Sequence, residues 1–512
     1  MACSRPPDPA EVAGTIGASA ISQHTQKLST DEMEGRAPGS KGEELATAYI
    51  ADFYRSLGLK TSFQAVPLVG IDGVPSDLTL TRGGQKRVLR PGTQFVAFTQ
   101  QEVESIGIDG ELVFVGYGVT APEYQWNDFK DVDVKGKIIV LFVNDPPLAD
   151  PKMFGGKAMT YYGRWTYKYE EAARQGAAGA LIVHETGPAG YPWEVVQGGW
   201  SGERFDIVKA DKGVSDIKVG GWIQREVADQ IFIWAGHRFD DLKQKALQPD
   251  FKPIPLGIRA SVDVKNKLRH TDSKNVIGVL EGQTPEEYVI FTSHWDHLGI
   301  GLEQSGDKIY NGAIDNASGT AMMMEIARAF ASVQPRPKRS IVFLAVTAEE
   351  QGLLGSKYYA ENPVLPLNKT LANINMDSAN VYGRNDRIGV VGYGYSSLED
   401  ILREIAAQQG RTVVPEEEPE KGYYYRSDQF SFAKQGVPAL YLHTMKKEDD
   451  AKYTAERYHK PSDEFDPNWN LEGAVLDTRA YFLVGLRVAN DDKWPEWKPG
   501  TEFKAIREKM LK

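Results

Sequence analysis

The chain has 512 residues, of which 41% are hydrophobic and 25% charged, and its formal net charge is -11. This composition is typical of a folded globular protein, and the length allows a large core and at least one additional domain. The acidic balance argues against general nucleic-acid binding, no run of about 20 apolar residues predicts a membrane span, and a single cysteine excludes an internal disulfide framework.

The N-terminal part of the chain is predicted to begin the main domain. Residues 1–9 form a linker rich in Pro and Ala, and the cysteine, Cys3, lies within it. Residues 10–101 are predicted to be the first part of the main domain, with a turn-rich segment followed by an amphipathic helix over residues 43–59. Gly58 closes this helix, because glycine readily adopts the left-handed conformation found at helix ends.

Residues 102–262 have a different character and predict an inserted, β-rich domain. Two β-type runs, over residues 110–118 and 134–143, precede a predicted helix, a Gly-Ala turn and a buried strand over residues 169–184. This segment shows no catalytic constellation of its own. Aromatic side chains in its loops could either cover a site elsewhere or pack inside the insert: Tyr161, Tyr162, Trp165, Trp193 and Trp200.

The main domain is predicted to resume at residues 263–512. Three apolar runs in it, over residues 289–291, 340–346 and 371–376, predict buried strands, and each is followed closely by an imidazole or a carboxylate. A further carboxylate stands where a loop meets a predicted helix. These side chains belong to His294, Glu349, Glu350, Asp377 and Asp315. We therefore predict an α/β fold, with a mixed, mostly parallel sheet flanked by helices, whose strand ends gather these groups at one edge.

Imidazoles and carboxylates in this pattern suit a pair of divalent metal ions. Two ions about 3.5–4 Å apart can activate a water and polarise a carbonyl. Such a pair needs a bridging carboxylate, terminal His and Asp or Glu ligands, and one carboxylate left free to move a proton. The adjacent Glu349 and Glu350 suit this division, because successive side chains leaving a strand point apart. One imidazole is missing from residues 288–377, and His459 is the best candidate to supply it.

Five motifs in this order resemble peptidase family M28, the co-catalytic zinc peptidases that include many bacterial aminopeptidases. The likeness covers most of the chain, and the ordered set is far more specific than any one motif. The motifs are His294-x-Asp296, Asn311-Gly-Ala-x-Asp315-Asn316-x-Ser318-Gly319, Glu349-Glu350-x-Gly352-Leu353-x-Gly355-Ser356, Asn375-x-Asp377 and Tyr458-His459-x-Pro461-x-Asp463.

The resemblance implies two zinc ions per chain, both bound by Asp315. It assigns His294 and Asp377 to one ion and Glu350 and His459 to the other.

Further roles are implied for residues that do not bind metal. The resemblance makes Glu349 the general acid/base, places Asp296 behind His294 to orient it, and uses the Tyr458 hydroxyl to help hold the oxyanion. Arg426 belongs to a sequence motif whose region approaches the substrate in the family. An equal alternative is that Arg426 forms a structural pair with an aspartate. His297 follows His294 closely in the sequence and could be taken for a second ligand, but a structural or substrate-facing role is favoured.

The resemblance also implies a domain organisation and a cellular location. It predicts the zinc-exopeptidase, or phosphorylase/hydrolase-like, fold, with a protease-associated domain as the insert over residues 102–262. Ala2-Cys3-Ser4 resembles the end of a bacterial lipoprotein signal, which predicts a protein of the cell envelope or a secreted one with a lipid anchor at Cys3. The alternative is an accidental cysteine near the terminus.

The expected function is that of a zinc metalloprotease, a hydrolase that removes N-terminal residues from peptides. The acidic surroundings of the expected site can attract a free ammonium group, which favours an aminopeptidase. A carboxypeptidase or dipeptidase of the same family, a glutaminyl cyclase-like acyltransferase and a non-enzymatic, receptor-like binding protein remain alternatives. We expect a peptide as the partner and no nucleic acid.

Overall fold

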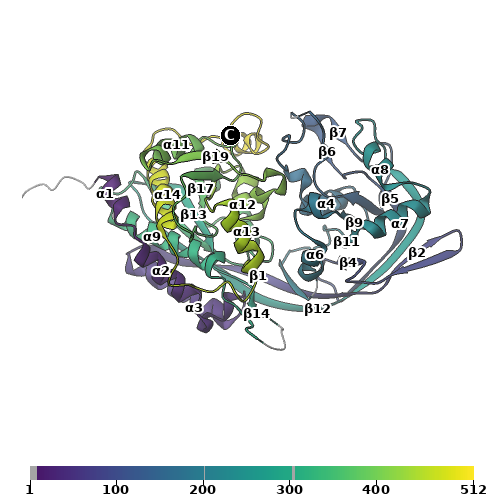
Figure 1. Ribbon diagram of the computed structural model, residues 1–512, viewed down its shortest axis with the longest axis horizontal. Helices are drawn as coiled ribbons and strands as arrows, with labels where there is room; N and C mark the ends of the chain where they lie inside the picture. The colour runs from purple at the N-terminus through teal and green to yellow at the C-terminus, as the bar shows by residue number, and fades with distance from the viewer. Residues whose placement is uncertain (1–7, 151, 201, 302–305) are drawn as a thin grey trace, which may run out of the picture. The chain divides into compact units, whose positions relative to one another are not determined.

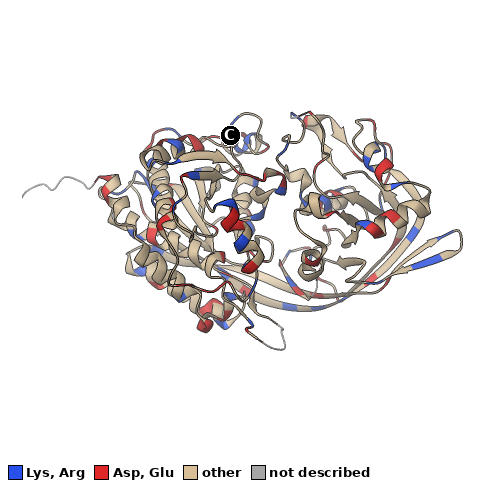
Figure 2. Cartoon of the chain, in the orientation of Figure 1, with Lys and Arg blue, Asp and Glu red and all other residues tan. Residues whose placement is uncertain are grey.

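The computed structural model describes residues 8–150, 152–200, 202–301 and 306–512, which form two compact units (Figure 1). The main unit comprises residues up to Val66, Asp272–Glu417 and Arg426–Lys512, and the inserted unit comprises Pro67–Thr271 and Glu418–Tyr425. Two long strands, β1 (Lys60–Pro75) and β12 (Ile254–Leu280), contribute residues to both units. Acidic and basic residues both occur along the helices of each unit (Figure 2).

The remaining elements of the main unit alternate between strands and helices. They are α1 (Pro9–Gly14), α2 (Ala18–Leu28), η1 (Asp31–Arg36), α3 (Lys41–Ser56), β13 (Thr284–His294), β14 (Gly299–Ile300), β15 (Ile309–Tyr310), η4 (Ala313–Ser318), α9 (Gly319–Ser332), β16 (Arg339–Val346), α10 (Leu354–Glu361), η5 (Leu367–Lys369), β17 (Thr370–Asn375), β18 (Arg387–Val390), α11 (Leu398–Gln408), β19 (Thr412–Pro415), α12 (Gln429–Lys434), β20 (Ala439–His443), α13 (Lys447–Glu456), α14 (Glu472–Asn490) and α15 (Lys504–Met510).

The main unit is built on a mixed, mostly parallel sheet, as the sequence predicts. Its strands lie in the order β19-β18-β20-β17-β13-β16-β12. The pairs β13–β16, β13–β17, β17–β20 and β18–β19 are parallel. Only β12–β16 and β18–β20 among the described neighbours in this order are antiparallel.

Helices cover both faces of this sheet because its central strands are apolar on both sides. Along β16, Phe343 belongs to a core shared with α9 and α14, whereas its neighbour Leu344 belongs to a separate core with α10 and α12. Successive strand residues point to opposite faces, so a continuous apolar run needs a cover on each. All eight residues of β16 are buried.

The inserted unit contains further strands, in the order β5-β8-β9-β11-β4, and several helices. Its elements, besides parts of β1 and β12, are β2 (Leu78–Arg82), β3 (Gln85–Leu89), β4 (Phe95–Phe98), β5 (Ser105–Phe114), β6 (Thr120–Ala121), η2 (Pro122–Tyr124), β7 (Trp126–Asn127), β8 (Ile138–Phe142), η3 (Tyr161–Gly163), α4 (Trp165–Arg174), β9 (Gly179–His184), α5 (Thr186–Ala189), α6 (Trp193–Gly199), β10 (Glu203–Ile207), β11 (Val219–Gln224), α7 (Arg225–Ala235), α8 (Phe239–Lys245) and η6 (Pro419–Lys421), and η7 (Tyr423–Arg426) runs from this unit into the main one.

The inserted unit is larger than the segment 102–262 that the sequence predicts. It starts at Pro67 because strands before residue 102 find their partners later in the chain: β4 pairs with β11, and β2 pairs with β12. Its central strands β5, β8, β9 and β11 are parallel. Its assignment as a protease-associated domain stays a prediction.

The aromatic residues noted in the insert pack against one another. Trp200 stacks on Phe98 with ring centroids 3.8 Å apart, and Trp165 meets Trp200 edge to face at 5.2 Å. Trp193 is buried, and its indole N–H donates to the carbonyl of Gly92 at 3.1 Å. These contacts account for the three tryptophans as packing inside the inserted unit.

A buried lysine is a further structural feature of the inserted unit. Lys168 on α4 is fully buried, and its ammonium donates to the carbonyls of Tyr117 at 2.6 Å and Asn144 at 3.1 Å. Burial lowers its pKa to about 8, opposed by the charges of Asp145 and Asp128. Burial likewise raises the pKa of each of these two carboxyls to about 7, opposed by their hydrogen bonds and by Lys168.

We expect Lys168→Met to destabilise the protein by about 3–5 kcal/mol at pH 8, because it leaves two buried carboxylates without their cation. The loss should shrink towards pH 5. Both carboxyls have raised pKa values in the folded protein, so they take up protons there before they do so in the unfolded chain, and the uncompensated charge disappears as the pH falls. Urea unfolding of both proteins at pH 5 and pH 8 measures this; an equal loss at the two values would contradict it.

Two observations bear on the predicted cellular location. Among the described residues, no helix combines the length and the apolar composition needed to cross a membrane. Cys3, on which the prediction of a lipid anchor depends, lies outside the described residues.

Candidate metal centre

The predicted metal ligands of the main unit all approach one edge of its sheet. His294 is the last residue of β13, Glu349 and Glu350 follow β16, and Asp377 follows β17. These three strands are neighbours and run parallel, so their carboxyl ends meet at the same edge. Asp315 comes from η4, just before α9.

The structure brings the first group of predicted ligands together around His294. Its Nε2 lies 3.4 Å from Asp315 Oδ1 and 3.4 Å from Asp377 Oδ1, and 4.0 Å from Glu349 Oε2. The side chain of His294 is 1% exposed. The second oxygen of Asp377 accepts a hydrogen bond from the Ser427 hydroxyl at 2.6 Å, which fixes the direction of the first.

The second group gathers around His459, in the loop after α13. Its Nε2 lies 3.0 Å from Glu350 Oε2 and 3.4 Å from Asp315 Oδ2. Asp315 therefore directs one carboxylate oxygen towards each histidine, His294 and His459. This is the arrangement that a carboxylate shared between two cations requires.

Potential ligand atoms also come close enough for metal binding. The donor atoms of His294, Asp315 and Asp377 all lie within 4.8 Å of one another, and the same holds for the set His297, Asp315 and Glu350. A third set joins His294 to Glu349 and Glu350. Asp315 is common to the first two sets.

Burial and charge shape the acid–base properties of the cluster. Burial raises the pKa of Glu349 well above its usual value, against the charge of His294 and with the help of the Glu350 and Asp377 charges. Burial also raises the pKa of Asp296 to about 8. For Asp315, burial favours a raised pKa, but its hydrogen bonds with His294 and His459 and the charges of His297 and His294 together lower the pKa well below the usual value. The cluster thus contains more carboxylates than its imidazoles can neutralise. This excess of negative charge favours the binding of cations.

Asp296 contacts more than the histidine that the sequence assigns to it. Its carboxylate accepts the backbone N–H groups of Glu349 at 3.1 Å and Glu350 at 3.4 Å. The carboxylate oxygen Oδ1 lies 3.7 Å from His294 Nδ1, whereas the backbone carbonyl of Asp296 lies 3.2 Å from that atom. Asp296 therefore holds the turn that presents the two glutamates, and its carbonyl is the group nearest to the histidine ring.

Asp463 has a positioning contact that sequence reasoning left unassigned. Its buried carboxylate accepts the backbone N–H groups of Ile314 and Asp315, each at 3.1 Å at closest, and the hydroxyl of Tyr453 at 3.3 Å. It thereby connects the loop of His459 to the loop of Asp315. The motif that ends in Asp463 was the available signal, although it does not tell which atoms the carboxylate meets.

The two remaining predicted residues lie close to this cluster in different ways. Tyr458 is 44% exposed, and its ring stacks on that of His459 with centroids 3.9 Å apart. Burial raises the pKa of Tyr458 well above its usual value, and the charge of the partly buried Arg426 opposes this rise.

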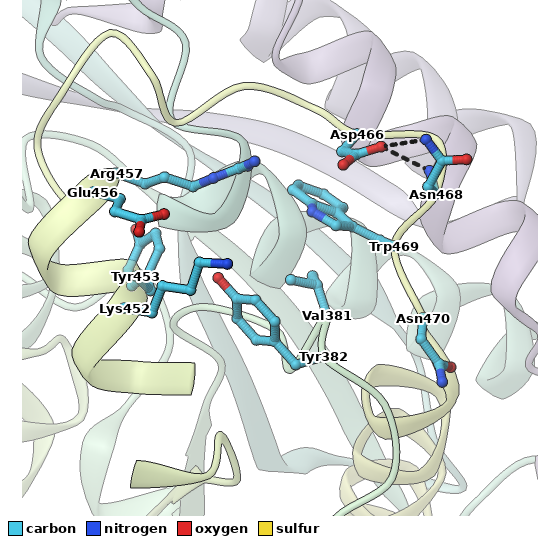
Figure 3. A pocket seen from close by; sticks show the side chains of 10 residues that line it. All are labelled: Val381, Tyr382, Lys452, Tyr453, Glu456, Arg457, Asp466, Asn468, Trp469 and Asn470. Carbon is cyan, nitrogen blue, oxygen red and sulfur yellow. Dashed lines mark hydrogen bonds between the residues drawn. The ribbon is translucent and has the colours of Figure 1, made fainter. Parts of the chain in front are cut away.

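A separate cavity of about 320 Å³ lies in the main unit (Figure 3). Its lining mixes both signs of charge, with Lys452 and Arg457 near Glu456 and Asp466, and Asn468 donates to Asp466 at 3.0 Å. The described lining includes none of the predicted metal ligands, so we assign no reaction to this cavity.

The fold and the donor cluster define a metal-binding α/β protein, and comparisons show which known proteins it is similar to. The model of peptidase family M28 matches residues 275–483, the stretch that holds every predicted metal ligand. Residues 275–483 are therefore similar to this family.

Curated relatives match shorter stretches. Aminopeptidase NAALADL1 of Mus musculus is 36% identical over 140 residues, which are 26% of this chain and 17% of that protein. The glutamate carboxypeptidase 2 homolog of Caenorhabditis elegans is 37% identical over 127 residues, 24% of this chain and 15% of that protein. The matches therefore span less than a fifth of the length of these relatives.

One solved structure resembles nearly the whole chain. The aminopeptidase from Aneurinibacillus sp. strain AM-1 aligns with a TM-score of 0.55 and 21% identity, covering 94% of this chain and 96% of that one. At this identity the likeness is one of fold, and it extends through the inserted unit.

Proposed function

We propose that the protein is a zinc-dependent exopeptidase that hydrolyses N-terminal residues from peptides. The observation that carries the proposal is Asp315, whose two carboxylate oxygens each face a different histidine within 3.4 Å. The match of residues 275–483 to the model of peptidase family M28 supports a peptidase.

The donor set fits zinc, which takes imidazole nitrogen and carboxylate oxygen as ligands. We assign His294, Asp315 and Asp377 to one ion, and Glu350, Asp315 and His459 to the other. Two zinc ions, when bound, supply Lewis acidity that polarises the scissile carbonyl and lowers the pKa of a water to about 7.

Glu349 is the proposed general acid/base. Its Oε2 lies 4.0 Å from His294 Nε2, farther than the 3.4 Å of the Asp315 and Asp377 oxygens. A raised pKa suits a carboxyl that must take a proton from water and pass it to the leaving amine. We further propose that the Tyr458 hydroxyl donates to the developing oxyanion. Asp296 is proposed to hold the turn that carries Glu349 and Glu350 in place.

The choice of aminopeptidase follows from charge. The excess of carboxylates in the cluster favours a substrate with a free ammonium group. A carboxypeptidase needs a cation for the terminal carboxylate, and Arg426 near Tyr458 is the candidate for that role. This residue, and the occurrence of both activities among the names of the relatives, makes carboxypeptidase the second candidate.

We expect the zinc-loaded protein to hydrolyse members of a library of aminoacyl chromogenic substrates. A chelator should abolish the activity and added zinc should restore it, because the reaction depends on the bound ions. Matched peptides, one acetylated at its N-terminus and one amidated at its C-terminus, provide the control: only the amidated peptide should be cleaved. Cleavage of the acetylated peptide alone would favour the carboxypeptidase, cyclisation of N-terminal glutamine without hydrolysis would favour the acyltransferase, and no turnover of any substrate would favour a binding protein.

We also propose that the protein is exported to the cell envelope and anchored through Cys3. The support is the sequence Ala2-Cys3-Ser4 and its likeness to a processed lipoprotein signal.

A further inference from the structure

His297 is not among the predicted ligands, yet its contact with Glu350 is shorter than the contacts that join the predicted ligands to one another. Its Nδ1 lies 2.7 Å from Glu350 Oε1, and its side chain is fully buried. The other oxygen of Glu350, Oε2, lies 3.0 Å from His459 Nε2. The two oxygens of Glu350 are therefore divided: one faces His297 and the other faces the proposed metal ligand His459.

The surroundings of His297 fix its ring in one place. A Cβ atom added to Gly312 would come within 2.5 Å of the ring, so glycine at this position allows the loop to lie against it. The backbone N–H of His297 donates to the carbonyl of Arg36 at 3.4 Å, and the guanidinium of Arg36 donates to the carbonyl of Gly312 at 3.0 Å. The Gly312 backbone thus lies against the imidazole, and Arg36 connects the backbone of His297 to that of Gly312.

The hydrogen-bond geometry also sets the tautomer of His297. An ionised carboxylate only accepts hydrogen bonds, so Nδ1 must carry the hydrogen that it shares with Glu350. The other ring nitrogen, Nε2, is buried and has no hydrogen-bond partner among the described residues. Donation from a ring N–H to a carboxylate is the means by which side chains behind a metal site fix the ligands in front of it.

We propose that His297 is a positioning residue for Glu350: it binds Oε1 and thereby directs Oε2 towards the second metal ion. This inference rests on the proposed function, because it assumes that Glu350 is a ligand. It differs from the proposal that His297 is itself a ligand, because it uses the Nδ1 hydrogen and leaves Nε2 without a role in metal binding.

Two substitutions separate these possibilities. His297→Leu removes both nitrogens. His297→Asn keeps an N–H donor near the position of Nδ1, since the asparagine amide nitrogen is the same number of bonds from the backbone, but it offers nothing in the position of Nε2. His184→Leu is the matched control, because His184 is also buried and forms a hydrogen bond with the Tyr191 carbonyl in the inserted unit.

The experiment is a zinc titration of metal-free protein against a chromophoric chelator, with melting temperature measured alongside. The same titration of His459→Ala identifies the step that belongs to the second ion. We expect His297→Leu to weaken that step about 10–100-fold, as loss of a group behind a ligand does, and to leave the first step unchanged. His297→Asn should bind within a few fold of the parent, and His184→Leu should match it.

Each other outcome has a distinct meaning. A parent protein that binds no zinc would refute the proposed function itself. If the parent binds two ions and His297→Leu binds them equally well, the positioning role is wrong. If His297→Asn binds as weakly as His297→Leu, the residue acts as a ligand through Nε2, and if both steps weaken together with a large fall in melting temperature, it serves the fold alone.

Discussion

Glu349→Gln is expected to reduce turnover by about 10²–10⁴ while the protein keeps its zinc. Glutamine has almost the same size and shape as glutamate, but its amide cannot accept a proton from water and pass it on. The backbone N–H of Glu349, which donates to Asp296 at 3.1 Å, does not change with the side chain. The turn that also carries Glu350 should therefore stay in place.

The neighbouring residue provides a control for this prediction. Glu350→Gln alters a proposed ligand whose Oε2 lies 3.0 Å from His459 Nε2, so it should lower zinc content first and activity as a consequence. The two measurements are steady-state kinetics with saturating zinc and metal analysis after dialysis. Full activity of Glu349→Gln would remove Glu349 from the mechanism, and loss of zinc from it would make Glu349 a ligand.

The fold of the main unit could be predicted because its signals are local. Apolar runs such as residues 340–346 predict strands that need cover on both faces, and β16 has that cover. Parallel neighbours then bring the residues that follow their carboxyl ends to one edge. This is why His294, Glu350 and Asp377 could be predicted to meet at one edge. Asp315 and His459 reach the same cluster on η4 and on the loop after α13, so their positions could be predicted only from the motifs.

The groups that hold these ligands could not be predicted in the same way. Asp463 binds backbone N–H groups of residues almost 150 positions earlier, and Asp296 binds those of Glu349 and Glu350. Backbone donors leave no trace in residue type, so a sequence motif indicates that a carboxylate is present but not which amides it meets. His297 is a related case: its contact with Glu350 depends on how closely the loop at Gly312 approaches its ring.

The limits of the inserted unit show the same distinction. Runs such as residues 134–143 predict strands correctly, and β8 lies there. The start of the unit depends on pairing between β4 and β11 and between β2 and β12, over separations of more than 100 residues. The composition of the chain changes near residue 102, whereas the inserted unit begins well before that point, at Pro67.

Asp315→Ala is expected to abolish stable binding of both zinc ions, and activity with it. Every other proposed ligand serves one ion, whereas Asp315 faces His294 with Oδ1 and His459 with Oδ2, each at 3.4 Å. Removing it takes one ligand from each ion and also the negative charge shared by both. The backbone of the loop should persist, because Asp463 binds the N–H of residue 315 and of Ile314 whatever the side chain.

Metal analysis after dialysis distinguishes this shared role from that of an ordinary ligand. Asp377→Ala should lose one zinc and keep the other, since Asp377 belongs to the donor group around His294. Asp400→Ala, which alters a half-exposed carboxylate that pairs with Arg403 and Lys498, should keep the zinc content of the parent. Two zinc ions retained by Asp315→Ala would show that the bridge is misplaced, and one retained ion would assign Asp315 to the other site alone.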